Sequence, residues 1–91
     1  MSIQVRVPTV LRTYTGGAKE VASEGATVGE VFDTLDVAHP GIKGRVVDEQ
    51  GQLRRFVNVY VDNEDVRFSD GLETPVADGA QLSIIPAVAG G

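Results

Sequence analysis

The sequence predicts an α+β fold in which a mixed sheet packs on one main helix. Alternating apolar residues predict strands near both ends of the chain, and one apolar stripe with helical spacing predicts a helix between them. Gly, Pro, Asn and Asp separate these segments as turn residues do. The chain has 91 residues, of which 42% are hydrophobic, so we expect one globular domain with a modest core.

The first strand is predicted at the N-terminus, where Ile3, Val5 and Val7 alternate with polar residues up to Pro8. A loop follows and ends in a turn at Gly16 and Gly17. A second strand is expected over residues 19–22. Together these segments would form an opening hairpin with a long loop.

The main helix is predicted to begin after Thr27. Thr27 and Glu30 have the spacing of a capping box, in which each side chain accepts a hydrogen bond from the other residue's amide. The apolar stripe that the helix would bury consists of Val28, Val31, Phe32, Leu35 and Ala38. Pro40 disfavours a helical residue before it, so the helix should end near His39.

The second half of the chain is predicted to be mostly extended. A short helical turn over residues 42–48 and a turn at 49–51 precede the strongest strand pattern, at 53–61. We expect a polar turn at 62–65, a short extended segment at 66–68, turns at 70–71 and 78–79, and a last strand at 82–85 that Pro86 closes. If the first and last strands lie side by side at the centre, the helix can supply the return connection.

Composition excludes several function classes. The net charge of −5 disfavours binding to nucleic acid, and an acidic face suits a basic protein partner. The absence of cysteine excludes disulfides and thiolate catalysis, and a lone histidine, His39, is no metal site. No apolar run approaches the ~20 residues of a membrane span. The N-terminus lacks the pattern of a signal peptide, so we expect a cytoplasmic protein without membrane contact.

The chain ends in two glycines, which chance would place there in roughly 0.5% of chains. We divide the chain into a domain at 1–85 and a tail at 86–91. Ala87, Val88 and Ala89 are small enough to enter a narrow channel, and Gly90 permits backbone angles that other residues avoid. An extended tail from Pro86 would reach about 20 Å. The pattern indicates a terminal carboxylate presented to another protein's active site.

These features resemble the MoaD/ThiS family of ubiquitin-like sulfur carrier proteins, and within it the branch that supplies sulfur for cysteine biosynthesis. The family has the β-grasp fold, so the resemblance implies that fold here. It covers the whole chain and rests on PTVLR at 8–12, TGG at 15–17, RFVNVYV at 55–61, NEDVR at 63–67 and PAVAGG at 86–91.

The resemblance implies a protein co-substrate and not an enzyme. Gly91 would be the site of adenylation and of the thiocarboxylate that donates sulfur. Partner enzymes would bind the residues before it, which are Gly90, Ala89, Val88, Ala87 and Pro86. The chain would hold no cofactor of its own, since ATP and magnesium would be used by an E1-like adenylating sulfurtransferase. The other implied partners are a PLP-dependent cysteine synthase and a metal-dependent peptidase that releases the product.

Three alternatives stay open at the level of sequence. The first keeps the carrier role and changes the pathway: the small subunit of molybdopterin synthase, which would pair with that enzyme's large subunit, or the thiazole sulfur carrier. The second is a ubiquitin-like adaptor with an inert C-terminus. The third, a hydrolase or another stand-alone enzyme, ranks lowest because the sequence shows no nucleophile–base pair and no metal cluster. By alternation, one side of the 53–61 strand would also face away from the helix, and an apolar surface there would serve docking.

Overall fold

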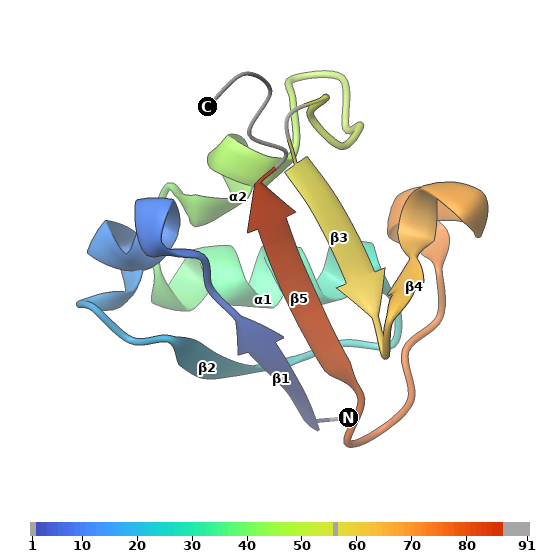
Figure 1. Ribbon diagram of the computed structural model, residues 1–91, viewed down its shortest axis with the longest axis horizontal. Coiled ribbons are helices and arrows are strands. Elements are labelled where there is room, and N and C mark those ends of the chain that lie inside the picture. Colours follow the sequence, from blue (N-terminus) through green and yellow to red (C-terminus); the bar gives the residue numbers. More distant parts are fainter. Residues whose placement is uncertain (1, 56, 87–91) are drawn as a thin grey trace.

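The structure is a computed structural model that describes residues 2–55 and 57–86. Within these residues the chain forms one five-stranded sheet, and helix α1 (Val28–Ala38) lies across one face of it (Figure 1). The predicted α+β architecture is confirmed. The strands are β1 (Ser2–Arg6), β2 (Glu20–Glu24), β3 (Val57–Val61), β4 (Glu64–Asp65) and β5 (Gln81–Pro86). The shorter helices are α2 (Ile42–Val46) and the 3₁₀ helices η1 (Thr9–Thr15), η2 (Val66–Phe68) and η3 (Gly71–Glu73).

The first and last strands lie side by side at the centre of the sheet, as predicted. The strand order is β2-β1-β5-β3-β4, with β1 and β5 parallel and the other neighbours antiparallel. Val5 is paired with Leu82 in this central register. Because β1 and β5 run in the same direction, the chain leaves both strands at the same end of the sheet. The predicted hairpin of β1 and β2 is present, and η1 occupies its long loop.

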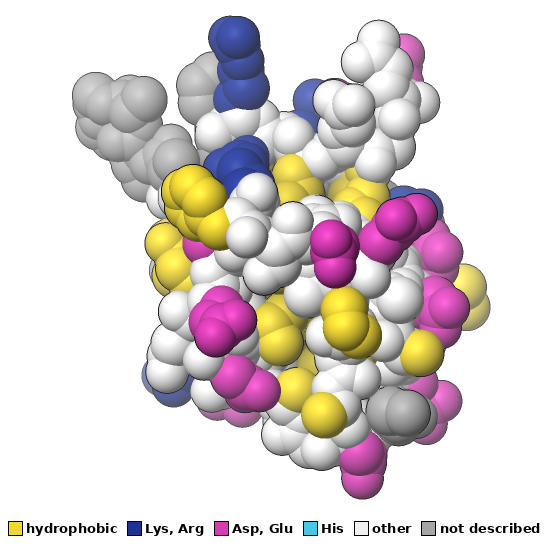
Figure 2. Space-filling view, turned by 90° about the vertical axis from the view of Figure 1, so that its right-hand side faces the viewer, with side chains coloured by type: hydrophobic (Ala, Val, Ile, Leu, Met, Phe, Trp, Pro, Cys, Tyr) yellow, Lys and Arg dark blue, Asp and Glu magenta, His cyan; other side chains and the backbone are white. Residues whose placement is uncertain are grey.

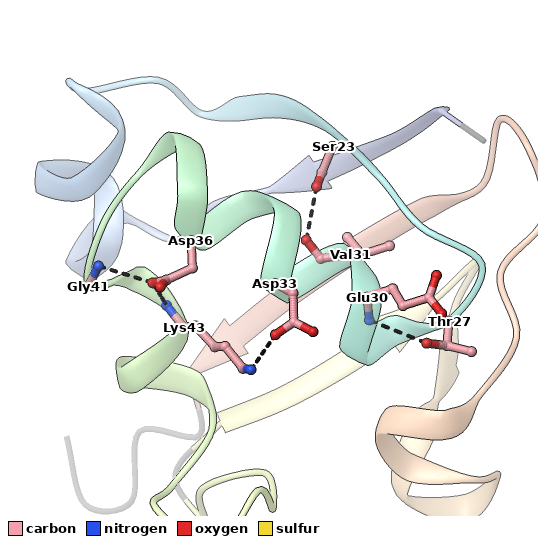
Figure 3. A network of polar contacts seen from close by, with 8 residues as sticks. All are labelled: Ser23, Thr27, Glu30, Val31, Asp33, Asp36, Gly41 and Lys43. Atoms are coloured by element: carbon pink, nitrogen blue, oxygen red, sulfur yellow. Dashed lines mark hydrogen bonds and ion pairs between the residues drawn. The ribbon is translucent and has the colours of Figure 1, made fainter.

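The start of α1 follows the predicted cap with one difference. Thr27 Oγ1 accepts a hydrogen bond from the Glu30 amide at 3.3 Å (Figure 3). The Glu30 carboxylate, however, accepts from the amide of Ala26 at 3.0 Å and not from that of Thr27. Thr27 is extended and forms an isolated β-bridge with Pro75, which leaves the Ala26 amide facing the carboxylate.

The core lies between α1 and the sheet. Val28, Val31, Phe32 and Leu35 are fully buried, but Ala38 is exposed, so the prediction for that fifth position was wrong. Ala38 is the last residue of α1, where the chain turns away from the sheet at His39. On the sheet side the buried residues are those that alternate along each strand, including Ile3, Val5, Val59, Leu82 and Ile84.

Polar contacts join the helices to their surroundings. The buried Ser23 hydroxyl of β2 donates to the Val31 carbonyl at 2.9 Å, which ties β2 to α1 (Figure 3). The Asp36 carboxylate accepts from the amides of Gly41 and Lys43, at 3.0 and 3.1 Å, at the start of α2. An ion pair between Lys43 and Asp33 also links α2 to α1. The position of α2 therefore depends on the acidic side of α1.

The strand predicted at 53–61 is shorter than expected, because β3 begins at Val57. Leu53 instead forms an isolated bridge with Val47, and the Arg54 amide donates to the Val46 carbonyl at 2.9 Å. These contacts hold the first part of the predicted strand against α2. Phe56 lies outside the described residues.

Two other predictions after β3 need correction. Only Asp62 and Asn63 form the predicted polar turn, both with positive φ, and Glu64 and Asp65 pair back onto β3 as β4. The segment at 66–68 is the 3₁₀ helix η2 and not extended chain. The Asp65 carboxylate starts it by accepting from the Arg67 amide at 2.9 Å.

Candidate functional site

The predicted site residues lie at and beyond the end of β5. Pro86, predicted as the first residue of the tail, is the last residue of β5, where it is paired with Val57. The other predicted site residues, Ala87, Val88, Ala89, Gly90 and Gly91, lie outside the described residues. The part of the site that can be described is therefore the surface around Pro86, which we call the tail root.

The end of β5 loses one of its two neighbours before it reaches Pro86. Strand β1 pairs with β5 only as far as Ser83, whereas β3 pairs with it through Pro86. Beyond Ser83 the chain of β1 turns at Pro8 into η1, which diverges from the sheet. Pro86 has no amide hydrogen to donate, which suits the last position of a ladder. At the tail root, β5 is therefore paired on one side only, with β3.

Two clefts flank the tail root. The first, which we call the apolar cleft, encloses about 320 Å³ between η1, α2 and the ends of β3 and β5. Its walls are apolar, and Arg45 and Arg54 stand among its lining residues. The second, which we call the basic cleft, encloses about 350 Å³ and is lined by three cations and one acidic residue, Glu20, together with Ser83 and Ile85. These cations are Arg6, Arg12 and Lys19.

Hydrogen bonds hold one arginine of each cleft in place. Arg12 Nε donates to the Val7 carbonyl at 3.1 Å, and Arg54 Nε donates to the Gly44 carbonyl at 2.9 Å. Both acceptors are neutral, so both guanidinium groups keep their charge available. Arg6 forms a loose ion pair with Glu20, with 3.8 Å between Nε and the carboxylate oxygen. Positively charged side chains therefore line both clefts at the tail root, with Glu20 beside Arg6 and with Asp48 and Glu49 beside Arg54.

The opposite end of the sheet is acidic. Asp62, beside the start of β5, accepts from the Gln81 amide at 3.0 Å, and Asp78 accepts from the Ser2 amide at 2.8 Å. The six residues of β5 separate the two ends by about 20 Å. Figure 2 shows Lys and Arg side chains mainly toward the top of that view and Asp and Glu mainly below, although acidic atoms also occur at the top and basic ones lower down. In a chain with a net charge of −5, the arginines of the two clefts thus lie at the end where β5 leaves the sheet, with Glu20, Asp48 and Glu49 as acidic neighbours.

His39, weighed above as a metal ligand, and the buried Thr15 have structural roles. His39 caps the end of α1, and its Nδ1 lies 3.1 Å from the Tyr14 carbonyl. The buried hydroxyl of Thr15 lies within hydrogen-bond distance of the Arg12 and Ala18 carbonyls at the end of η1. Across residues 2–55 and 57–86, no group of three His, Asp or Glu side chains could hold a metal ion. Over the same residues, no helix is both long and apolar enough to span a membrane.

The open face of the sheet is mixed in character. Its outward positions include the half-buried Asn58 and Tyr60 of β3 and the exposed Ile85 of β5. Polar residues lie beside the apolar ones: Ile85 is paired with Asn58, and Tyr60 with Ser83. Among the described residues this face is no continuous apolar surface. Sequence reasoning did not find the two clefts, because their residues come from segments far apart in the chain and no local motif marks them.

Comparisons with known proteins agree with the resemblance found in the sequence. A family model, the ThiS family, matches residues 5–91. The sulfur carrier protein CysO of Mycobacterium tuberculosis is 50% identical over 93 residues, with 100% of both chains covered. A chain in the crystal structure of the BexX/CysO complex of Amycolatopsis orientalis is 57% identical with a TM-score of 0.92, covering 98% of this chain and 99% of that one. The molybdopterin synthase sulfur carrier subunit of Phaeosphaeria nodorum is 32% identical, covering 87% of this chain and 79% of its own.

Proposed function

Since this chain belongs to the ThiS family, we propose that it carries sulfur as a thiocarboxylate on Gly91, for use in the biosynthesis of cysteine. Family membership and the close structural neighbours confirm the β-grasp fold and the family that the sequence predicted. The observation that carries the proposal is the full-length identity of 50% with a sulfur carrier protein, in a chain that ends with two glycines.

The chemistry of a carboxylate explains why a partner enzyme is needed. A free carboxylate is a poor acyl donor, because an oxide anion is a poor leaving group. Attack of a Gly91 carboxylate oxygen on the α-phosphorus of ATP would release pyrophosphate and form an acyl-adenylate. Sulfide sulfur would then attack the acyl carbon and expel AMP, which leaves the thiocarboxylate. We assign ATP and magnesium to an E1-like adenylating enzyme, and none of this chemistry to side chains of this chain.

The tail root supports the presentation of such a terminus. The five residues after Pro86 can extend to about 17 Å, which is enough to enter a buried active site while the domain stays outside. Gly91 has no Cβ to hinder attack at its carbonyl, and Gly90 allows the chain to bend. The carrier would then act as a co-substrate: the sheet that ends at Pro86 stays outside the partner enzyme, and the terminus reacts inside it.

The identity of the relatives favours one pathway over the others. The chain is 50% identical to CysO but 32% identical to a molybdopterin synthase subunit, and the second alignment covers less of both chains. We therefore propose a PLP-dependent cysteine synthase as the enzyme that accepts the sulfur, and a metal-dependent peptidase as the enzyme that removes the product. The molybdopterin and thiazole pathways are the less favoured alternatives.

Mass spectrometry of the intact protein tests the carrier role. The chain is incubated with the E1-like enzyme of its own organism, ATP, magnesium and sulfide. We expect the mass increase of one oxygen replaced by sulfur, located on the C-terminal peptide, and none for a chain that lacks Gly91. An unchanged mass for the intact chain would favour the adaptor with an inert end.

Affinity capture from a lysate of the same organism tests the pathway. The intact chain should retain a PLP-dependent synthase, which its absorbance and its mass identify, and a chain without residues 87–91 should not. Retention of a molybdopterin synthase large subunit in its place would show that the assignment to cysteine biosynthesis is wrong.

A further inference from the structure

The apolar cleft beside the tail root has the composition of a docking site. Three of its walls are buried side chains: Leu11 of η1, Val57 of β3 and Ile84 of β5. Val10, on the same 3₁₀ helix, is 65% exposed at the edge of the cleft. Protein interfaces have the same arrangement, with an apolar centre and a polar rim.

The edge of this cleft is positively charged. Arg45 and Arg54 are both exposed and both line it. Over residues 2–55 and 57–86 the ion pairs are Arg6 with Glu20 and Lys43 with Asp33, so neither of these two arginines is in an ion pair there, although Arg54 has Asp48 and Glu49 as neighbours. Arg54 is held toward the cleft by its bond to the Gly44 carbonyl, which itself lies in α2. An occupant that places carboxylates at this edge gains attraction from both.

We propose that the apolar cleft docks an acidic protein segment with one apolar side chain, presented by the adenylating enzyme that receives the tail. The inference rests on the proposed function, because it names a contact surface of the same partner. Charge complementarity carries it: the chain is acidic as a whole, with a net charge of −5, whereas Arg45 and Arg54 at the edge of the cleft attract carboxylates. Such polarity orients the approaching carrier so that its tail enters first.

The position of the cleft agrees with that occupant. Pro86 lines it together with the arginines, so a segment bound there lies next to the first residue of the tail. The partner would therefore hold the carrier at the point from which the tail extends. Binding at the cleft would thus set how far the reacting terminus can reach into the partner enzyme.

Two pairs of variants test the proposal, each with a control of equal charge. Val10→Asp is compared with Val37→Asp, because both valines are exposed and Val37 lies on α1, at 84% exposure. Arg45→Gln is compared with Thr34→Glu, which also lowers the net charge by one unit and lies on the exposed side of α1. Binding of each chain to the E1-like enzyme of the same organism is measured by surface plasmon resonance at low and high salt.

We expect Val10→Asp to weaken binding by about tenfold or more, because it replaces an apolar contact of the cleft with a carboxylate that repels an acidic segment. Arg45→Gln should slow association by roughly threefold or more at low salt and have little effect near 1 M salt, where the screening length falls to about 3 Å. Val37→Asp and Thr34→Glu should bind like the unchanged chain. Circular dichroism checks that all four variants fold.

Several results would overturn the proposal. Equal binding of Val10→Asp and Val37→Asp, with a wild-type chain that is still loaded with sulfur, would overturn this proposal alone. Tighter binding of Val10→Asp would show that the chain's own tail occupies the cleft. Dimers of the wild-type chain that Val10→Asp disrupts in sedimentation equilibrium would assign the cleft to a second copy. A wild-type chain that neither binds nor is loaded would overturn the proposed function as well.

Discussion

Gly25 lies in the loop between β2 and α1, where the helix passes so close that no side chain fits. A Cβ at this position would lie 2.7 Å from the Val31 nitrogen and 2.8 Å from the Glu30 Cβ. These atoms belong to the first turn of α1, which cannot shift without changing the cap at Thr27. Gly44, in the middle of α2, is the opposite case, because a Cβ there would meet nothing within 4 Å.

These two glycines give a prediction at the scale of single residues. Gly25→Ala should lower the free energy of unfolding by about 1–3 kcal/mol, as overpacking does. Gly44→Ala should raise it by about 0.5–1 kcal/mol, because alanine favours a helix more than glycine. Urea denaturation with both variants measures the two changes. An unfolding midpoint of Gly25→Ala equal to that of the unchanged chain would mean that the loop moves aside without cost.

At the scale of elements, the start of α2 is capped by a carboxylate of α1. Its own N-cap residue, Gly41, has no side chain to accept a bond, and Asp36 of α1 accepts from the amides of Gly41 and Lys43 in its place. A five-residue helix has little stability of its own. The wall of the apolar cleft that α2 provides is therefore positioned from α1.

Asp36→Ala tests this dependence. The loss of the cap should lower the free energy of unfolding by about 1 kcal/mol. It should also speed hydrogen exchange of the α2 amides more than that of the α1 amides. Asp36→Asn is the matched control, since its carbonyl oxygen can still accept both bonds. If Asp36→Ala leaves exchange in α2 unchanged, other contacts hold the helix.

The elements that the sequence predicted well are those with local signals. The alternation of β1 and the stripe and cap of α1 depend on residues close in the chain, so their patterns could be read directly. The start of β3 could not, because Leu53 and Arg54 look suited to a strand and are held against α2 by partners at Val46 and Val47. Ala38 has the right spacing but lies beyond the edge of the sheet that would cover it.

At the scale of the whole molecule, the terminal motif was visible in the sequence, and the surface around its root was not. The apolar cleft joins Val10, Arg45, Val57 and Pro86, which the parallel pairing of β1 with β5 and the placement of α2 bring together. The distribution of charge has the same origin. Arg6, Arg12 and Arg54 come from separate segments and line the clefts at one end of the sheet, beside Glu20, whereas Asp62 and Asp78 lie at the other end.

Removal of residues 87–91 tests the separation of fold and chemistry. The buried core cluster is built from Ile3 to Ile84, so the shortened chain should unfold within about 0.5 kcal/mol of the full chain, as changes away from a core do. The same chain should accept no sulfur from the adenylating enzyme. Denaturation in urea and intact mass measure the two properties. A large loss of stability would show that the tail also supports the domain.

The parallel pairing of β1 with β5 also places Ser2 far from Pro86. Ser2 lies beside Asp78 at one end of the sheet. The chain leaves β5 at the opposite end, about 20 Å away by the length of the strand. A purification tag, a fluorophore or a surface anchor attached upstream of Ser2 would therefore point away from any enzyme that takes the terminus. The same attachment at the other end would replace the carboxylate itself, so immobilisation should use the amino end.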